Sequence, residues 1–571
     1  MSRVRGLLTA AVAAVRLAAD DPVWLTVQAG HRLPGPVRSR VGSAAVRHGR
    51  RPALRAWGHL LEGDVRSARG SLDPVPTGSA LDASLRVHAG LPPDIRRSPA
   101  ATVRSAWLTG DLDLLARVSD DPAAPPRSRA IAHDHLDLLT ARPRPLPRGP
   151  APAAVTSDLR SPGAARHRVV HVLTNSTPWT HSGYTMRTHA ILTAQRRHDI
   201  DVVAITRPGY PASVGRPWFR PADVIDDVTY VRSAPLRPPR TEAERVDLWA
   251  EDIVRLAARH GATHLHATTH YVNALATEAA AGALGLPWIY EVRGQLERTW
   301  AAGRAAAGDP EPLSSARYAR WRAAEAAVAS RADAVVTISE AMADDLIARG
   351  VDSRRITLAP NCIDASLLEI STAPREARTV VGLPADGFWV GAVTSVVHYE
   401  GLTVLAEAIA RARAAGHDVR GAIVGDGVAF PSLASRVAEL GLEDLVLLPG
   451  RMPQPVAQQW LQALDVVAIP RQNVAVTQHV PPLKLIEALG VGRPAIVSDL
   501  PAITEVVRDG VSAVVVPPGD AAALAAAIIR LASDPDLRTH LCDAGRQAAE
   551  PRTWDALAGV YARIYAEVAR R

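Results

Sequence analysis

Residues 481–510 read PPLKLIEALGVGRPAIVSDLPAITEVVRDG and contain the two patterns that decide the fold. A helix-forming run carrying Lys484 and Glu487 is followed by PAIVSD at 494–499, a short strand that is apolar along its length. Strands of this kind, alternating with helices, indicate parallel sheets that are covered on both faces. The stretch also contains the only lysine of a chain that has 65 Lys plus Arg residues.

The same pattern recurs along most of the chain. The apolar strands fall into two series, the first at 168–174, 201–207, 263–269, 287–294 and 333–339, the second at 388–394, 421–426, 445–450, 466–471 and 494–499. Two series of similar size predict the α/β class, with two Rossmann-like domains and a cleft between them.

The remaining segments divide the chain further. Apolar residues spaced three and four apart at 53–72 and 130–141 predict an N-terminal α-helical module. A stretch rich in Pro and Arg follows, which is typical of an exposed linker. The predicted parts are the helical accessory module (1–141), the linker (142–166), the first Rossmann-like domain (167–365), the second (366–552), and a C-terminal helix (553–571) that packs back on the first.

Composition narrows the class of protein. With 47% hydrophobic and 22% charged residues the chain is globular, and its excess of Arg over Lys indicates coding bias. Its two cysteines, Cys362 and Cys542, lie far apart and outside any metal-ligand spacing, so a reducing cytosol is expected. The apolar run at 6–15 is too short to span a bilayer. An amphipathic helix is favoured there over a signal peptide.

Arg471 and Lys484 are the candidates for binding an anion. Arg471 ends the strand VVAIPR and Lys484 begins the next helix, and ligands of α/β sheets bind beyond the carboxyl ends of strands. Two cations near a helix N-terminus predict a diphosphate site. An ammonium is a compact point charge that Arg does not replace, although one lysine could also survive by chance on a solvated face. Glu487 lies on the same helical face as Lys484 and could accept hydrogen bonds from two ribose hydroxyls.

These residues resemble the nucleotide-sugar site of the retaining GT-B glycosyltransferases of family four, also called glycosyltransferase group 1. The likeness covers about 167–571 and is carried by PPLKLIEALG and by HYEGLTVLAEAIARAR at 398–413, typical of the branch with YEGL and PLK...EA motifs. It implies that Lys484 and Arg471 contact the donor diphosphate and that Glu487 holds the ribose.

Three segments of the first domain extend the resemblance. HSGYTMRTHAI at 181–191 is similar to the loop that approaches the donor phosphate, which implies donor contacts for Ser182 and Gly183. HLHATTHYVN resembles the strand end where the second histidine, here His266, lies beside the reacting sugar. In YEVRGQLERTW, Arg293 is the candidate for a sugar, phosphate or acceptor contact, while Glu291 ranks lower because it could be structural.

One position departs from the family pattern. Relatives carry two glutamates separated by seven residues, but counting back from Glu487 gives His479, beside Gln478. Either residue could meet the sugar hydroxyls in place of the missing glutamate. Three histidines at 264, 266 and 270 could suggest a metal site, but no carboxylate or Cys lies near them in sequence. No metal and no cofactor is therefore expected, which agrees with the resemblance.

The resemblance implies a metal-independent hexosyltransferase-type enzyme that transfers a sugar from UDP or GDP to a hydroxyl with retention, in cell-surface polysaccharide or glycolipid synthesis. The acceptor would be a carbohydrate or lipid-linked molecule. The alternative is a binding or scaffolding protein whose GT-B site has decayed, since the first glutamate is missing. An oxidoreductase is disfavoured, because no GxGxxG follows any strand.

The N-terminal segment suggests a location. Residues 1–55 contain ten Arg against two Asp, so this segment could hold the protein on the inner, anionic face of the membrane. A solvated helical face and a protein-docking module are the alternatives. We otherwise expect a cytoplasmic protein without a nucleic-acid partner.

Overall fold

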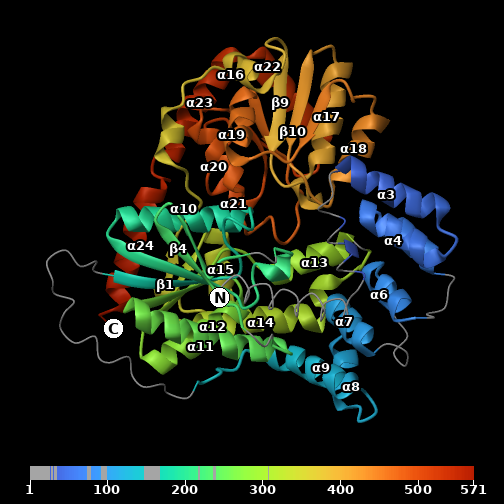
Figure 1. The fold of residues 1–571 in the computed structure, drawn as a ribbon. Coiled ribbons are helices and arrows are strands. Elements are labelled where there is room, and N and C mark those ends of the chain that lie inside the picture. The colour runs from blue at the N-terminus through green and yellow to red at the C-terminus, as the bar shows by residue number, and fades with distance from the viewer. Residues whose placement is uncertain are drawn as a thin grey trace.

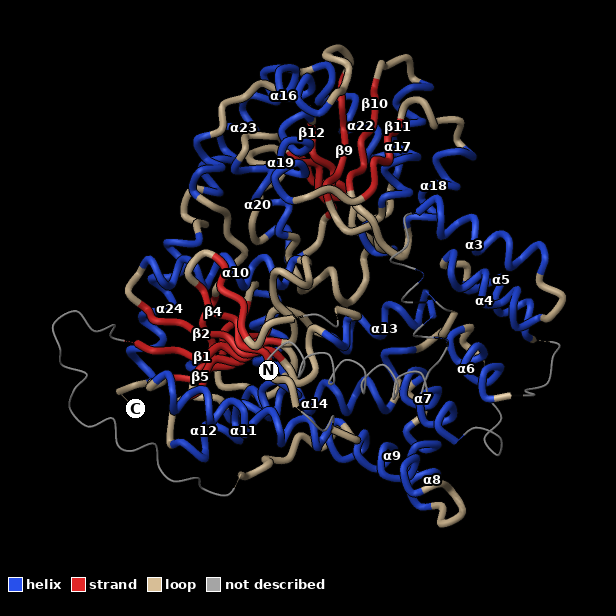
Figure 2. The backbone as a smooth tube through the Cα atoms, viewed as in Figure 1, coloured by secondary structure: helices blue, strands red, loops and turns tan. Residues whose placement is uncertain are grey.

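The computed structural model describes residues 23, 26–27, 30, 35–73, 79–91, 99–146, 167–216, 219–235, 239–306 and 308–570. The helix expected at 6–15 and most of the linker expected at 142–166 lie outside these residues. Figures 1 and 2 show two separate groups of strands, each surrounded by helices, and a further group of helices at one side. The predicted α/β class with two Rossmann-like domains is confirmed.

The first sheet has eight strands in the order β3-β4-β2-β1-β5-β6-β7-β8. All neighbours are parallel except β3 and β4, which form an antiparallel hairpin. Its strands are β1 His167–Leu173, β2 Ile200–Thr206, β3 Ala222–Ile225, β4 Val228–Arg232, β5 His264–Thr268, β6 Trp288–Val292, β7 Ala334–Thr337 and β8 Ile356–Leu358. Its helices are α10 Gly183–Arg197, α11 Glu242–His260, α12 Tyr271–Leu284, α13 Leu296–Ala306, α14 Ala316–Arg331 and α15 Glu340–Ala348.

The second sheet has six parallel strands in the order β11-β10-β9-β12-β13-β14. The order reverses between β9 and β12, and ligands of such sheets bind at this reversal. The strands are β9 Phe388–Val393, β10 Val419–Val424, β11 Val446–Gly450, β12 Val466–Ile469, β13 Ala495–Ser498 and β14 Val514–Val516. The helices are α16 Pro374–Val381, α17 Leu402–Ala414, α18 Phe430–Glu439, α19 Gln454–Ala463, α20 Leu483–Gly490, α21 Pro501–Thr504, α22 Ala521–Ser533 and α23 Pro535–Ala549.

Alternate residues of each strand enter different cores. In β1, Val170 and Val172 pack toward α11 and α12, whereas Val169 and Leu173 pack toward α10 and the last helix. The second sheet likewise separates two apolar clusters. Burial on both faces explains why the strands are apolar throughout. Short 3-10 turns connect the elements at 212–214, 312–314, 353–355, 365–369 and 398–400.

The N-terminal helices pack on the first Rossmann domain. They are α3 Gly35–His48, α4 Pro52–Glu62, α5 Val65–Leu72, α6 Ala80–His88, α7 Pro99–Thr109, α8 Leu112–Asp120 and α9 Pro126–Leu138. The Asp134 carboxylate accepts the backbone N–H of Ala243 in the first turn of α11 (3.0 Å), and the Trp300 indole of α13 donates to the Leu108 carbonyl (2.9 Å). Arg317 stacks on Trp107 at 4.0 Å. These contacts fix the helical module against the domain, as Figure 1 shows for α7 and α9.

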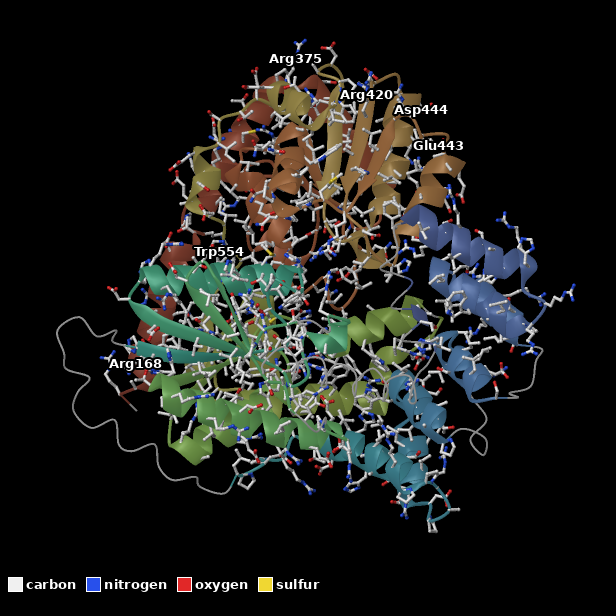
Figure 3. All side chains as sticks on the ribbon, in the orientation of Figure 1. Arg168, Arg375, Arg420, Glu443, Asp444 and Trp554 are labelled. Atoms are coloured by element: carbon white, nitrogen blue, oxygen red, sulfur yellow. The ribbon has the colours of Figure 1, made fainter. Side chains whose placement is uncertain are left out.

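The last helix, α24 (Trp554–Val568), returns to the first domain. It packs against α10, and Trp554 lies where the chain passes between the two domains (Figure 3). The two crossing segments are paired, because Ile363 N–H donates to the Arg552 carbonyl (2.9 Å) and Trp554 N–H to the Ile363 carbonyl (3.1 Å). Within the described ranges, every helix is too short or too polar to span a bilayer.

Candidate active site between the two Rossmann domains

Two loops meet where the strand order of the second sheet reverses. Glu400 follows β9 and Arg471 follows β12, and the Glu400 Oε1 accepts from Arg471 Nε (3.0 Å) and NH2 (2.6 Å). Both side chains are buried. Gly401 makes this approach possible: its φ is +67°, and a Cβ there would lie 1.9 Å from the Pro470 carbonyl oxygen. Glu400 is a site residue that the sequence reasoning missed, although it lies within the recognised HYEGL motif.

The entry into α20 is held from both domains. Arg471 NH1 donates to the Val480 carbonyl (2.7 Å), and the Asn361 side-chain amide, from the segment crossing between the domains, donates to the Pro481 carbonyl (3.0 Å). Every nitrogen of the Arg471 guanidinium is thus engaged, and the arginine positions the residues just before Lys484.

Lys484 and Glu487 form an ion pair on the first turns of α20. The Lys484 Nζ lies 2.6 Å from the Glu487 Oε2, and the side chains are 31% and 9% exposed. No side chain caps α20, whose N-cap is Pro482. Uncapped N–H groups and the helix dipole favour an anion at this end. The structure thus brings together the predicted cation, the predicted ribose acceptor and a helix N-terminus.

His479 and Gln478 lie in the loop before α20. The Ser339 hydroxyl, at the start of α15, donates to the His479 carbonyl (2.6 Å) across the domain interface. The His479 ring contacts the Ala475 carbonyl (3.0 Å), and burial together with nearby Arg298 lowers its pKa. The Gln478 amide donates to the Asn473 side chain (2.8 Å). Of these two residues, His479 is the one that faces the first domain.

Ser182 and Gly183 begin α10 on the opposite side of the interface. Ser182 caps the helix in a reciprocal capping box with Thr185. Gly183 is exposed, and a Cβ there would meet nothing within 4 Å. The preceding His181 carbonyl accepts from Arg451 NH2 of the second domain (2.9 Å). The loops after the strands of both sheets therefore face one another here.

Glu291 occupies the centre of a fully buried charge network. Its Oε1 accepts from the Tyr561 hydroxyl (2.8 Å) and from Arg187 NH2 (3.3 Å), and its Oε2 accepts from Arg293 NH2 (2.7 Å). The His266 Nε2 lies 3.2 Å from the same Oε2. Burial alone would raise the pKa of Glu291, but Arg293 and its other partners hold that pKa well below its ordinary value.

His266 lies inside this network and not at a strand end. It is in the middle of β5, is 0% exposed, and its Nδ1 contacts the Tyr565 hydroxyl of α24 at 2.8 Å. Burial lowers its pKa. The sequence argument that no carboxylate lies near the histidines is wrong in space, because Glu291 of the neighbouring strand does. No group of three or more metal-binding side chains occurs within the described ranges.

Arg187 connects this network to the donor side of the interface. Besides Glu291, it donates to the Ala359 carbonyl (2.6 Å), the Pro360 carbonyl (2.7 Å) and the Asn361 Oδ1 (3.1 Å). Asn361 in turn holds Pro481. The sequence reasoning missed Arg187. The available signal was its spacing: Arg187 lies four residues before Ile191, so helical periodicity places this basic residue on the apolar face of α10.

Two sheets with this strand order, joined by crossing segments and facing each other through their carboxyl-end loops, define the GT-B class. Solved structures agree with this fold: a sucrose-phosphate synthase from Thermosynechococcus elongatus superposes with a TM-score of 0.59 at 20% identity, over 71% of this chain and 99% of that chain. Anabaena HepE in complex with UDP and glucose superposes with a TM-score of 0.53 at 17% identity, over 70% of this chain and 100% of that chain.

Family profiles identify both domains. The profile described as "Glycosyl transferase 4-like domain" matches residues 182–362, and "Glycosyl transferases group 1" matches residues 387–534. The chain therefore belongs to the group 1 glycosyltransferases.

Curated relatives match at the level of sequence. The D-inositol 3-phosphate glycosyltransferase of Thermobispora bispora is 31% identical over 35% of this chain and 48% of its own length. That of Thermomonospora curvata is 26% identical over 57% of this chain and 78% of its own length. The 2-deoxystreptamine glucosyltransferase of Streptomyces kanamyceticus is 28% identical over 36% of this chain and 52% of its own length. The chain thus spans about half the length of two of these three relatives.

Proposed function

We propose that the protein transfers a glycosyl group from a UDP or GDP sugar to a hydroxyl acceptor, with retention at the anomeric carbon and without a metal. The observation that carries the proposal is the pair of the partly exposed Lys484 and the buried Glu487 on an uncapped helix, beside the point where the strand order reverses. Cationic side chains, a helix N-terminus and a ribose acceptor are the parts that a nucleoside diphosphate requires.

Donor binding would proceed by exchange within this pair. The Lys484 ammonium leaves the Glu487 carboxylate for a diphosphate oxygen, and the freed carboxylate accepts hydrogen bonds from the ribose hydroxyls. Because each group loses one partner and gains another, neither charge is left alone. Arg471, held by Glu400 and Val480, keeps the loop before Lys484 in place during the exchange.

Catalysis would rest on stabilising the leaving diphosphate. As the bond between C1 of the sugar and the diphosphate oxygen breaks, negative charge grows on that oxygen, where Lys484 and the amides of α20 can stabilise it. The acceptor oxygen then bonds to C1 from the same face. Its proton passes to the leaving phosphate, so the step balances without an enzymatic nucleophile.

For the acceptor we propose a chemical class, and for the location a side of the membrane. Relatives are named for inositol phosphate and 2-deoxystreptamine glycosyl transfer, so a polar hydroxyl compound is the expected acceptor class. We place the reaction in cell-surface polysaccharide or glycolipid synthesis, on the cytoplasmic side, with residues 1–55 contacting the inner membrane face.

Thermal unfolding with a panel of UDP, GDP and ADP sugars tests the donor. A ligand at one hundred times its Kd stabilises the native state by about 2.7 kcal/mol, which is readily measured as a rise in Tm. We expect one nucleotide to stand out and Lys484→Ala to abolish its effect. Stabilisation without sugar transfer or hydrolysis would favour the decayed, binding-only alternative. No stabilisation by any nucleotide sugar would overturn the proposal.

A further inference from the structure

The helical module is an addition to the fold shared with the structural neighbours. HepE and the sucrose-phosphate synthase are covered almost completely by 70% and 71% of this chain, respectively. The family profiles begin only at residue 182. The module is nevertheless docked firmly, through Asp134, Trp300 and Arg317, on the first Rossmann domain. Helices α3 and α4 are connected to this docked part through α6, which packs against both α4 and α7.

The α3–α4 hairpin differs in charge from the rest of the module. Residues 35–62 contain six arginines and one acidic residue, Glu62, whose carboxylate accepts from the Ser43 hydroxyl (2.8 Å). Residues 63–146 contain eleven arginines and ten aspartates. The composition bias that favours Arg acts on both segments alike, so it does not explain why acidic residues are scarce in one of them only.

Most exposed residues of the hairpin lie on one face of α3 or in and just after the turn. On α3, positions 37, 40, 41, 47 and 48 follow the spacing of one helical face, and they are Val, Arg, Val, Arg and His. The turn and the start of α4 add Arg50, Arg51, Leu54 and Arg55, all exposed. We call these nine residues the hairpin surface. In the described part of the chain, none of its arginines forms an ion pair with a carboxylate.

Apolar residues are interleaved with the arginines on this surface. Val37, Val41 and Leu54 are 41%, 37% and 45% exposed. Figure 1 shows α3 and α4 at the edge of the molecule, apart from both sheets. By contrast, the outer end of the second domain carries both signs of charge: Arg375 pairs with Asp386, Arg420 lies 3.9 Å from Asp418, and Glu443 and Asp444 lie at the same end (Figure 3). Arginines without paired carboxylates suit a partner with an anionic surface. The exposed aliphatic side chains among them suit a partner with an apolar layer just beneath its charges.

We propose that the hairpin surface docks the protein on an anionic lipid bilayer, with the arginines on lipid headgroups and Val37, Val41 and Leu54 entering the interface. A nucleic acid would satisfy the arginines but leave the aliphatic side chains in water. Docking through this module would bring the first Rossmann domain to the membrane surface. The docking specifies the surface behind the membrane contact that the proposed function gives to residues 1–55, and its consequence for a lipid-linked acceptor rests on that function.

Vesicle sedimentation of the full-length protein tests the docking. Each arginine near an anionic surface strengthens binding about fivefold, so neutralising three should weaken partitioning onto phosphatidylglycerol-containing vesicles roughly a hundredfold. The variant replaces three arginines of the turn, Arg47, Arg50 and Arg51, by Ala. A matched control replaces three exposed arginines elsewhere by Ala, Arg411, Arg508 and Arg563, and should partition as the wild type does.

Three further arms separate the possible sources of binding. The combined substitution Val37→Ser, Val41→Ser and Leu54→Ser should weaken binding to vesicles but not to duplex DNA. Inorganic phosphate at the same ionic strength as a chloride control should not compete, because one phosphate offers no bilayer. Vesicles of phosphatidylcholine alone should not bind the protein.

Equal partitioning of the two triple-arginine variants would overturn the inference, and so would serine substitutions without effect. Nucleotide-sugar stabilisation is measured on the same variants. If it persists while docking fails, this inference alone is wrong. If docking is seen but no nucleotide sugar stabilises the protein, the proposed function is wrong and the docking stands.

Discussion

The two charge clusters that resemble ligand sites in sequence have different surroundings in the structure. On the second domain, Lys484 is 31% exposed and pairs with one carboxylate, that of Glu487. On the first domain, Glu291 is 0% exposed and meets four side chains, from α10, β5, α24 and the loop after β6. A charge with one partner at a partly open position can exchange that partner for a ligand. A buried charge with several partners cannot do so without leaving other charges unpaired.

Acid should therefore destabilise the buried cluster. Burial lowers the pKa of His266 below 6.5 and that of His264 to about 4, so the unfolded chain takes up these protons before the native protein does. The stability that these neutral histidines contribute is fully present above their unfolded pKa of about 6.5. It falls as the pH drops below that value, by about 1.4 kcal/mol per pH unit for His264 down to pH 4. Below pH 4.5, Glu291 adds to the loss, since its native pKa is also lowered. Tm measured from pH 7.5 to 4 checks this.

Glu325 provides a control of opposite sign. Its pKa is raised by burial to about 7, so the native state holds a proton that the unfolded chain releases above pH 4.5. It therefore adds stability as the pH falls from 7 toward 4.5. Glu325→Gln should make the acid dependence of Tm steeper. A Tm independent of pH between 6.5 and 4.5 in both proteins would contradict the role given to the buried groups.

Glu291→Ala should give the largest effect of a single substitution. It leaves Arg187 and Arg293 buried without their shared carboxylate, and breaking a buried pair in this way costs about 3–5 kcal/mol. Denaturant unfolding measures the loss. Glu291→Gln keeps the shape and one acceptor oxygen, so it should fall between the alanine variant and the wild type. An unchanged unfolding free energy combined with lost nucleotide binding would instead assign Glu291 to the ligand.

Lys484→Ala should give the opposite result. Removing a preorganised charge from the leaving group lowers turnover by about 10²–10³-fold. The unfolding free energy should change by less than about 1 kcal/mol, because a partly exposed ion pair contributes little. Lys484→Arg keeps the charge but places a planar fork where a compact ammonium stood, so it should recover only part of the activity. Near-normal transfer by the alanine variant would refute the assignment.

The sequence predicted the fold well where structure depends on local pattern. The apolar strands at 168–174 and 494–499 are seen as β1 and β13, because burial on both faces leaves a signal within a few residues. The β3–β4 hairpin was missed. Its turn places Asp226 and Asp227 at φ of +46° and +60°, a conformation usually signalled by Gly.

The candidate site was predictable to the extent that its contacts are local. Lys484 and Glu487 are three residues apart, so helical spacing alone places them on one face. Glu400 and Arg471 meet across 71 positions, and Arg187 meets Glu291 across 104. Periodicity carries no information on such distant pairs. His266 and Arg293 were assigned by motif likeness, which gives the position along a strand but does not distinguish an interior side chain from one that faces a ligand.

Tyr561→Phe should destabilise the protein less than Glu291→Ala does, and it distinguishes the two clusters most cleanly. The substitution removes one hydroxyl that donates to the Glu291 carboxylate and leaves Arg187, Arg293 and His266 in place. A hydrogen bond to a charged group contributes about 1.5–3 kcal/mol, so the unfolding free energy should fall by about 2 kcal/mol, with no change in turnover. Tyr565→Phe is the matched control on the same helix: its hydroxyl contacts His266 and Gln195, whose ring and amide are uncharged, so the loss should be nearer 1 kcal/mol. Equal losses would mean that the carboxylate charge does not govern the network, and a fall in turnover with Tyr561→Phe alone would place Glu291 in the reaction.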